Sequence, residues 1–397
     1  MKEKIRQRAL ELGFDDCRFT TAAAPTSAGQ FQNWLAGKQH GEMTWLERTA
    51  SKRVDPQQVL PGAKSIICLA ASYGSHSSTR IGAQPDTAAI FSPSPPSKEE
   101  RGGMRRPQQD QIPSPQPSPR SGGEREPASV LCCAPLISRY AQFTDYHDVL
   151  GERLKELTRF VNQLGGAETH SLWYVDTGPL LERDFAQRAG IGFIGKHTNV
   201  ISRRFGNWIL LGEIITTLEL EPDAPEKNHC GNCARCITAC PTHAITAPFQ
   251  LDARLCISYL TIELKGSIPV ELRPAIGHRI FGCDDCLAAC PWNRFAREGR
   301  LMKAYARPDL AAPDLIELLQ LDEAGFKSRF AGTPILRTKR RGLLRNVCVA
   351  LSNTGDTSAL PALQKAAKDS EPLIAEHARW AMERIQALRP LKTPASS

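Results

Sequence analysis

Residues 230–241 read CGNCARCITACP, and residues 282–293 read GCDDCLAACPWN. The first stretch has the spacing Cys-x2-Cys-x2-Cys-x3-Cys-Pro, and the second has the last three cysteines and the proline of the same pattern. In this pattern three thiolates of a run bind one [4Fe–4S] cluster and the fourth binds a second cluster. Zinc is the alternative, but zinc sites usually have two separated cysteine pairs. The sequence therefore predicts two [4Fe–4S] clusters.

The second run lacks its first cysteine, because Ile280 stands at the position where that residue would fall. A fourth ligand must therefore come from elsewhere, and Cys256 is the nearest candidate. Because the last cysteine of each run serves the other cluster, we predict two mixed ligand sets. One consists of Cys230, Cys233, Cys236 and Cys290, and the other of Cys240, Cys256, Cys283 and Cys286.

The start of the chain is expected to carry no export signal. Residues 1–19 predict a charged amphipathic helix without the apolar core of a secretory signal. No apolar run is long enough for a membrane span. We therefore expect a cytoplasmic protein without membrane contact, in which cysteines serve metal rather than disulfides. The cysteines outside the two ligand sets are expected in the core or in linkers: Cys17, Cys68, Cys132, Cys133 and Cys348.

Composition and hydrophobic spacing predict an α+β protein of three domains. Residues 1–217 alternate helix and strand patterns, which predicts an N-terminal α/β domain. Residues 84–133 interrupt it with a stretch rich in Pro, Ser, Gly, Arg and Glu, and we expect this low-complexity insert to be disordered. Residues 218–300 form a predicted ferredoxin-like two-cluster domain. Residues 301–397 form a predicted α-helical, HEAT-like region.

Individual elements follow from the spacing of apolar residues. The run at 64–71, KSIICLAA, predicts a buried strand, and Pro361 and Pro372 stand where first helical turns are expected. The other main predictions are helices at 2–13, 29–38, 145–164, 180–189, 341–352, 361–368 and 372–388, and strand or loop pieces at 171–175, 191–195, 199–202 and 208–217.

A carboxylate follows one of these strands. Asp176 lies directly after the strand at 171–175, a place where loops commonly line the sites of α/β proteins. From the residues alone, a helix N-cap is the commoner role for such an aspartate. The glycine-rich stretch 188–196 permits close backbone approach to a ligand, but it is not a nucleotide-binding G-x-G-x-x-G motif.

Several motifs together resemble the epoxyqueuosine reductase family. The longest is VDTGPLLERDFAQRAGIGFIGKHTNVI at 175–201, and it stands with the two cysteine runs and with CISYLTIELKG at 256–266. Shorter matching stretches are SKRV at 51–54, DYHDVL at 145–150 and KRRGLLRNVCVAL at 339–351. The resemblance covers about residues 1–83 and 134–390, and leaves the insert outside it.

The resemblance implies an activity and its cofactors. Enzymes of this family reduce the epoxide of epoxyqueuosine at the wobble position of tRNA to queuosine, the last step of queuosine biosynthesis. They are monomeric and cytoplasmic, and they bind cobalamin beside two [4Fe–4S] clusters. The region 1–217 would then be the cobalamin-binding catalytic domain. An external low-potential electron donor of the flavodoxin or ferredoxin type is also expected.

The resemblance also implies roles for single residues. Asp176 matches the proton donor of the family, which would protonate the oxygen released when the epoxide opens. Cobalt(I) of cobalamin would be the strong reductant that this opening needs. The cofactor contacts implied by the matching motifs are Arg53, Ser138, Lys196, Ser258 and Lys265.

The net charge of +8 has two interpretations, solubility or a polyanionic partner. Five cations gather at the start of the C-terminal helices: Arg337, Lys339, Arg340, Arg341 and Arg345. A solvated helix face is the plain interpretation of this cluster. With tRNA as the substrate, a phosphate-binding surface becomes the favoured one.

Two other functions fit parts of the sequence. A corrinoid reductive dehalogenase-like enzyme acting on a small molecule would share the cobalamin and cluster core, but it would lack the basic helical tail and commonly carries an export signal. A non-catalytic ferredoxin module would need only the cysteines. Neither Asp176 nor a cobalamin pocket would have a role in such a module.

Overall fold

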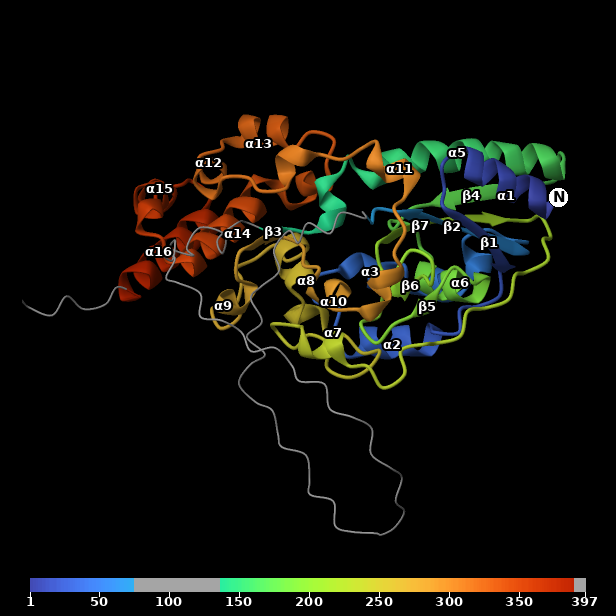
Figure 1. Ribbon diagram of the computed structural model, residues 1–397, viewed down its shortest axis with the longest axis horizontal. Coiled ribbons are helices and arrows are strands. Elements are labelled where there is room, and N and C mark those ends of the chain that lie inside the picture. The colour runs from blue at the N-terminus through green and yellow to red at the C-terminus, as the bar shows by residue number, and fades with distance from the viewer. Residues whose placement is uncertain (75–135, 389–397) are drawn as a thin grey trace, which may run out of the picture. The chain divides into compact units, whose positions relative to one another are not determined.

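A four-stranded antiparallel sheet forms the centre of the N-terminal part of the protein. The computed structural model describes residues 1–74 and 136–388 (Figure 1). The strand order is β1 (Asp16–Thr21), β2 (Ser65–Ser72), β7 (Ile209–Thr216) and β4 (Ser171–Tyr174), and each neighbouring pair is antiparallel. The predicted strands at 64–71, 171–175 and 208–217 are thus confirmed, with ends that differ by at most one residue.

Helices cover both faces of this sheet. Figure 1 shows α1 (Lys2–Glu11) and α5 (Tyr146–Gly165) on one face and α6 (Glu182–Ala189) on the other. Every residue of β2 is buried, because its alternate side chains enter two different cores. Ile67, Leu69 and Ala71 pack with α1 and α5, whereas Ile66, Cys68 and Ala70 pack with α6. An uncharged run such as SIICLAAS can be buried in this way at little cost.

The segment that carries the cysteines is built from short elements. Its helices are α7 (Arg235–Thr238), α8 (Ile257–Ile262), α9 (Arg273–Ile276) and α10 (Asp285–Ala288), with 3-10 turns at Ala253–Leu255 and Pro291–Phe295. Strand β8 (Arg279–Phe281) pairs in parallel with β3 (Leu136–Ile137). Ile280 is fully buried in β8, so the position that lacks a cysteine belongs to the hydrophobic core.

The connections to the sheet are also short. They comprise α2 (Ala28–Ala36), α3 (Thr44–Arg48), α4 (Ala50–Val54), the hairpin of β5 (Phe193–Ile194) and β6 (Val200–Ile201), and 3-10 turns at Pro56–Gln58 and Arg139–Gln142. The strand or loop pieces predicted at 191–195 and 199–202 correspond to this hairpin, and the helix predicted at 29–38 is confirmed as α2.

Helices form the C-terminal part. These are α11 (Arg300–Lys303), α12 (Leu315–Leu319), α13 (Glu323–Arg329), α14 (Lys339–Thr354), α15 (Leu360–Ala366) and α16 (Pro372–Ala387), with 3-10 turns at Pro308–Leu310, Pro334–Thr338 and Thr357–Ala359. Pro361 and Pro372 stand in first turns, as predicted. The core of these helices includes Ile280 and Phe281 of β8, so the helices and the cysteine segment share one core.

All described residues belong to one compact unit, and the predicted division into 1–217, 218–300 and 301–397 stays a prediction. Cys17, Cys68 and Cys348 are fully buried, which confirms their assignment to the core. The insert at 84–133, including Cys132 and Cys133, lies entirely outside the described residues, so the predictions for it stay predictions. Among the described helices, none is both long and apolar enough to cross a membrane.

Candidate functional site

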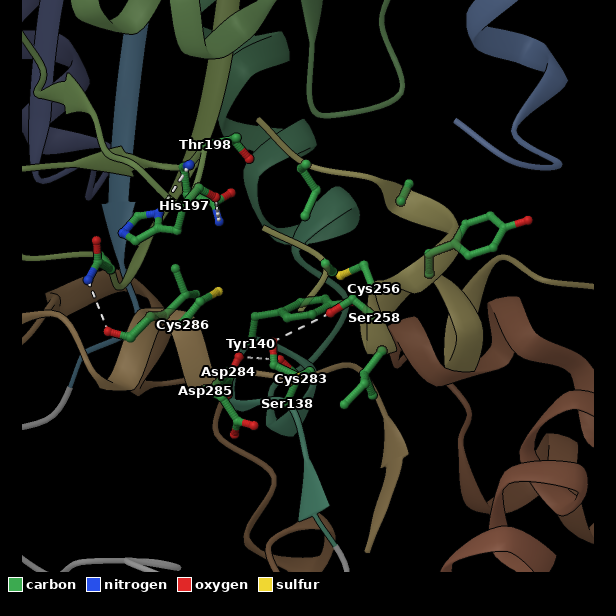
Figure 2. Close-up of a pocket in the computed structure, with 18 of the residues that line it drawn as sticks. Ser138, Tyr140, His197, Thr198, Cys256, Ser258, Cys283, Asp284, Asp285 and Cys286 are labelled. Carbon is green, nitrogen blue, oxygen red and sulfur yellow. Dashed lines mark hydrogen bonds between the residues drawn. The ribbon is translucent and has the colours of Figure 1, made fainter. Parts of the chain in front are cut away.

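A cavity of about 470 Å³ lies between the sheet and the cysteine segment. Four thiols of the second predicted ligand set line it, and we call them the inner quartet: Cys240, Cys256, Cys283 and Cys286. Asp176 lines the same cavity. Ser138 and Ser258 line it as well (Figure 2). Strand β7 contributes apolar wall from Ile209 to Leu211. Cofactor sites commonly combine such apolar walls with a few polar groups.

A second cavity, of about 230 Å³, is lined by the first predicted ligand set. We call these cysteines the outer quartet: Cys230, Cys233, Cys236 and Cys290. Trp292, Arg294 and Phe295 also line it, and the ring of Phe295 is 45% exposed. His197 lines both cavities. The structure therefore brings the eight cysteines together in the two groups that the sequence predicts.

The arrangement of thiols fits a cluster of several irons better than a single ion. In the described part of the chain, no three His, Cys, Asp or Glu side chains converge closely enough to hold one metal ion. Each quartet instead surrounds a cavity, and four thiols per group is the ligand number of a [4Fe–4S] cluster. Burial raises the pKa of the Cys283 and Cys286 thiols, which favours their protonated form. The positive charge of bound iron ions would favour the thiolate, which is the form that binds metal.

The inner quartet is tied to the strand that follows the insert. Asp284 is partly buried and accepts hydrogen bonds from the Ser138 hydroxyl and from the backbone N–H of Arg139, the latter at 2.6 Å (Figure 2). Gly282 has φ +71°, and a Cβ there would lie 2.5 Å from the Cβ of Ser138. Only glycine permits this close approach. The position of Ser138 at the cavity is therefore fixed by the residues beside Cys283.

Asp176 has an unusual backbone conformation. Its φ is +55°, a left-handed conformation that costs energy for a residue other than glycine. The Tyr146 hydroxyl donates a hydrogen bond of 2.8 Å to Oδ2 of Asp176, and Nε2 of His147 lies 3.9 Å from the same oxygen. The side chain of Asp176 remains 58% exposed. The carboxyl is thus held at one oxygen and accessible from the cavity.

Tyr146 itself is suited to donate this hydrogen bond. Burial and the negative charge of Asp176 raise the pKa of Tyr146, so its hydroxyl keeps its proton at neutral pH. The edge of the Tyr146 ring faces Tyr140, whose ring centroid lies 5.9 Å away. Both tyrosines line the cavity.

Two further carboxyl groups lie close to Asp176, and the sequence reasoning missed both. Glu182 is the first residue of α6 and lines the cavity, and Glu213 is fully buried in β7. Burial raises the pKa of each, and the charge of Asp176 contributes to both shifts. A signal was present in the sequence, because Glu213 is the lone charge in the apolar run WILLGEIIT at 208–216.

The predicted cofactor contacts separate into two groups. Ser138 and Ser258 line the large cavity, as the resemblance implies. Arg53 is buried beside it and donates to the Leu180 carbonyl at 3.0 Å, so it supports the loop after Asp176. Lys265 is exposed and does not line the cavity.

Lys196 contacts the loop that carries the first cysteines of the outer quartet. Its ammonium group donates to the carbonyls of Gly231 and Cys233, at 2.8 and 2.9 Å. It therefore holds the loop of the outer quartet and does not line the large cavity. The cofactor contact predicted for Lys196 stays a prediction, and the contacts described for its ammonium group are with the loop of the outer quartet.

The five cations of the basic cluster differ in their exposure and in their partners. Arg345 is 1% exposed and donates to the carbonyls of Leu260, Leu264 and Gly266, so the prediction of a surface contact with nucleic acid is wrong for this residue. Arg340 is bound to Asp369 and to the Leu321 carbonyl. Two cations of the cluster are exposed, Arg337 and Lys339, whereas Arg341 is partly buried.

These features define an iron–sulfur protein in which a cavity suited to catalysis lies next to one of the two cysteine quartets. A family model described as a 4Fe-4S double cluster binding domain matches residues 229–293. A second, described as epoxyqueuosine reductase QueG, DUF1730, matches residues 119–177. This second match begins inside the insert, so the prediction that all of 84–133 lies outside the resemblance is wrong for its last residues.

Whole-chain comparisons identify the family. The chain is 37% identical over 380 residues to an epoxyqueuosine reductase of Xanthomonas campestris pv. campestris, with 96% of this chain and 94% of the relative covered. It is 37% identical over 383 residues to that of Escherichia coli strain K12, with 96% and 89% covered. The chain belongs to the epoxyqueuosine reductase family.

Solved structures agree with this assignment. A crystal structure of epoxyqueuosine reductase with a tRNA-Tyr epoxyqueuosine-modified tRNA stem loop has a TM-score of 0.76 and 32% identity, and covers 97% of this chain and 90% of that one. The Bacillus subtilis epoxyqueuosine reductase, in a structure whose catalytic aspartate loop is swung out of the active site, has a TM-score of 0.76 and 30% identity, with 97% and 90% covered. The mixed helix and sheet fold is thus that of the family.

Proposed function

We propose that this protein reduces the epoxide of epoxyqueuosine in the wobble position of tRNA to queuosine, with cobalamin and two [4Fe–4S] clusters as cofactors. One observation carries the proposal. Asp176 and the inner quartet line the same cavity, so a proton donor and a source of electrons face one space. A non-catalytic ferredoxin module would have no use for this arrangement.

The cavity has the character that cobalamin requires. Its apolar wall from β7 and its tyrosines suit the faces of a macrocycle, and Ser138 and Ser258 supply polar contacts at its margin. When bound, cobalamin supplies a strongly reducing cobalt centre. The protein contributes the enclosing walls, the electrons delivered at the inner quartet, and the proton at Asp176.

Asp176 is the proposed proton donor. Opening an epoxide leaves an alkoxide, and an acid placed beside the oxygen stabilises the developing charge by giving it a proton. Tyr146 binds Oδ2, which leaves Oδ1 to carry and deliver that proton. The catalytic aspartate loop of the Bacillus subtilis relative supports this assignment.

The substrate would bind through phosphate contacts at the start of the C-terminal helices. Arg337, Lys339 and Arg341 are the proposed contacts, because Arg337 and Lys339 are exposed and Arg341 is only partly buried, whereas Arg340 binds Asp369 and Arg345 donates to a backbone carbonyl. Arg337 is 42% exposed, although it also pairs with Glu263 at 2.8 Å. Each phosphate contact releases counterions, so binding should weaken steeply with salt.

Electrons would enter at the outer quartet. Its cavity is bordered by the exposed ring of Phe295 and by Arg294, and further exposed cations nearby in the chain are Arg203, Lys227 and Arg235. A basic surface attracts an acidic partner. We therefore propose a flavodoxin or ferredoxin type of donor with an acidic docking face. The monomeric state and the cytoplasmic location stay predictions.

One experiment tests the function. The protein with reconstituted clusters and added cobalamin is given a chemical reductant and tRNA that contains epoxyqueuosine, and the nucleosides are identified by mass spectrometry. Queuosine is expected, and its formation should require cobalamin. Absence of queuosine with both cofactors bound would contradict the proposal, and dehalogenation of a small organohalide instead would favour the dehalogenase-like alternative.

A further inference from the structure

Four aromatic side chains cover one side of the outer quartet. Trp292, His229 and Phe295 line its cavity, and the buried Phe193 packs in the same apolar cluster as Cys290. The ring of Trp292 lies next to the other three rings. Its centroid is 5.5 Å from that of Phe193, 5.9 Å from that of His229 and 5.6 Å from that of Phe295. We call these four residues the aromatic cover, and Trp292 is its central member.

The aromatic cover extends from the interior to the surface. Phe193 is fully buried, Trp292 is partly buried, and Phe295 is 45% exposed. The guanidinium group of Arg294 lies 4.5 Å from the centroid of the Phe295 ring, so the outer end of the cover carries a positive charge. Trp292 also packs in the same apolar cluster as Cys230, a predicted iron ligand. It therefore lies between the predicted iron ligands and the exposed ring of Phe295.

The position of Trp292 is fixed by the next residue in the chain. Asn293 accepts a hydrogen bond of 3.0 Å from the backbone N–H of Asn207, and its amide group donates one of 2.7 Å to the carbonyl of Leu287. Gly206 has φ +63°, and a Cβ there would lie 2.7 Å from Oδ1 of Asn293. Glycine permits this close approach of the two segments. The turn that carries Trp292 is thus held from two sides, which keeps the ring beside the cavity.

Exclusion of water from an iron–sulfur cluster lowers its reduction potential. A [4Fe–4S] cluster with four thiolate ligands is an anion, and reduction adds one more negative charge. Water stabilises this added charge, whereas an apolar side chain does not. A covered outer cluster is therefore a stronger reductant than an uncovered one. This property suits a group that must pass electrons towards a strongly reducing cobalt centre.

We propose that Trp292 is a positioning residue of the outer cluster, whose ring excludes water from one side and so keeps the reduction potential of that cluster low. The ring also slows the loss of the cluster in air, because dioxygen must pass the same aromatic cover as water. One electron from the donor reduces the cluster, and no bond forms or breaks in this step. This role rests on the proposed function for its clusters and its donor, but not for the reaction in the large cavity.

The test compares Trp292→Ala, Trp292→Leu and Trp292→Phe with the wild type, as full-length protein loaded with both clusters. Trp173→Ala is the matched control, because Trp173 is 37% exposed in β4 and is not among the residues that line the two cavities. Iron content shows whether both clusters are present. A redox titration followed by electron paramagnetic resonance gives the reduction potentials of the clusters, and the decay of cluster absorption in air gives their stability.

We expect the potential of one cluster to rise in Trp292→Ala and, by less, in Trp292→Leu, while the other cluster keeps its potential. Loss of the affected cluster in air should become several-fold faster. Trp292→Phe retains an aromatic ring, so it should restore most of both properties. The control Trp173→Ala should match the wild type in potential and in stability.

Three results would overturn the inference. The first is an unchanged potential or an unchanged stability in air when Trp292 is replaced by alanine or leucine and both clusters are present. The second is a shift in Trp292→Phe as large as that in Trp292→Ala. The third is loss of the cluster from both the alanine and the leucine variant, because Trp292 would then be needed for assembly. These measurements need no tRNA, so a wild type that shows the expected potentials but forms no queuosine would contradict the proposed function alone.

Discussion

The inner quartet faces a cavity lined by carboxyl, hydroxyl and apolar groups, whereas the outer quartet faces exposed cationic and aromatic side chains. The two quartets come from the same pair of sequence motifs and differ by the exchange of one ligand position for Cys256. Their surroundings therefore assign different tasks to chemically similar groups. The outer surroundings suit the docking of a donor, and the inner ones suit the chemistry.

Loss of one thiol from either quartet should have the largest effect on queuosine formation, and the effect should differ between the two quartets. We expect Cys283→Ser to abolish queuosine formation with any reductant, because electrons can no longer reach the large cavity. Cys233→Ser should abolish it with a protein donor but leave part of it with a small chemical reductant that enters the cavity directly. Iron content and the electron paramagnetic resonance spectrum of each variant would show which cluster is lost. Equal behaviour of both variants with both reductants would contradict the division of tasks.

Removal of the proposed acid should have the next largest effect. Asp176→Ala is expected to lower queuosine formation by about 10²- to 10⁴-fold, the usual range for loss of a general acid. Iron content and cobalamin absorption should match those of the wild type, because Asp176 is 58% exposed and supports no core packing. Full activity in this variant would exclude Asp176 as the donor.

The cysteine ligands and Asp176 differ in how far the sequence alone predicts them. The spacing of the two cysteine runs predicts seven of the eight ligands, because each run lies within a few residues of backbone. The eighth, Cys256, lies outside the runs, and the core position of Ile280 explains why it is needed. Asp176 could be found only through the family motif, since a helix N-cap was the commoner role from the residues alone. Its hydrogen bond from Tyr146 joins residues thirty positions apart and depends on how α5 packs on the sheet.

Other features could not be predicted because they depend on which way a side chain points. Arg345 follows Arg341 by one helical turn in α14, but it faces the carbonyls of the cysteine segment. Lys196 binds the loop of the outer quartet because a hairpin turns it there. Glu213 comes near the loop of Asp176 through the register of β4 and β7, and Glu182 does so through the packing of α6 on the sheet. Motif spacing contains no information on these tertiary contacts.

A smaller effect is expected at the residue that orients the acid. Tyr146→Phe removes the hydrogen bond to Oδ2 of Asp176 and keeps the ring that packs beside Tyr140. We expect a loss of about tenfold in the rate of queuosine formation, corresponding to about 1.4 kcal/mol for one hydrogen bond to a carboxyl group. The comparison with Asp176→Ala is informative, because the double variant should be no slower than Asp176→Ala alone if Tyr146 acts through Asp176. Additive losses would show that Tyr146 acts on its own.

The smallest effects should come from surface charges, and they should separate the two faces. Arg294→Glu, beside the outer quartet, is expected to weaken use of an acidic protein donor several-fold and to leave tRNA binding unchanged. Arg341→Glu should do the reverse, because it removes a proposed phosphate contact and should lower the salt dependence of tRNA binding by about one counterion. Donor titrations and tRNA affinities at several salt concentrations measure both. If Arg341→Glu left the affinity for tRNA and its salt dependence unchanged, the tRNA surface would have to lie elsewhere. If Arg294→Glu left donor use unchanged, the outer quartet would lose its assignment as the entry point for electrons.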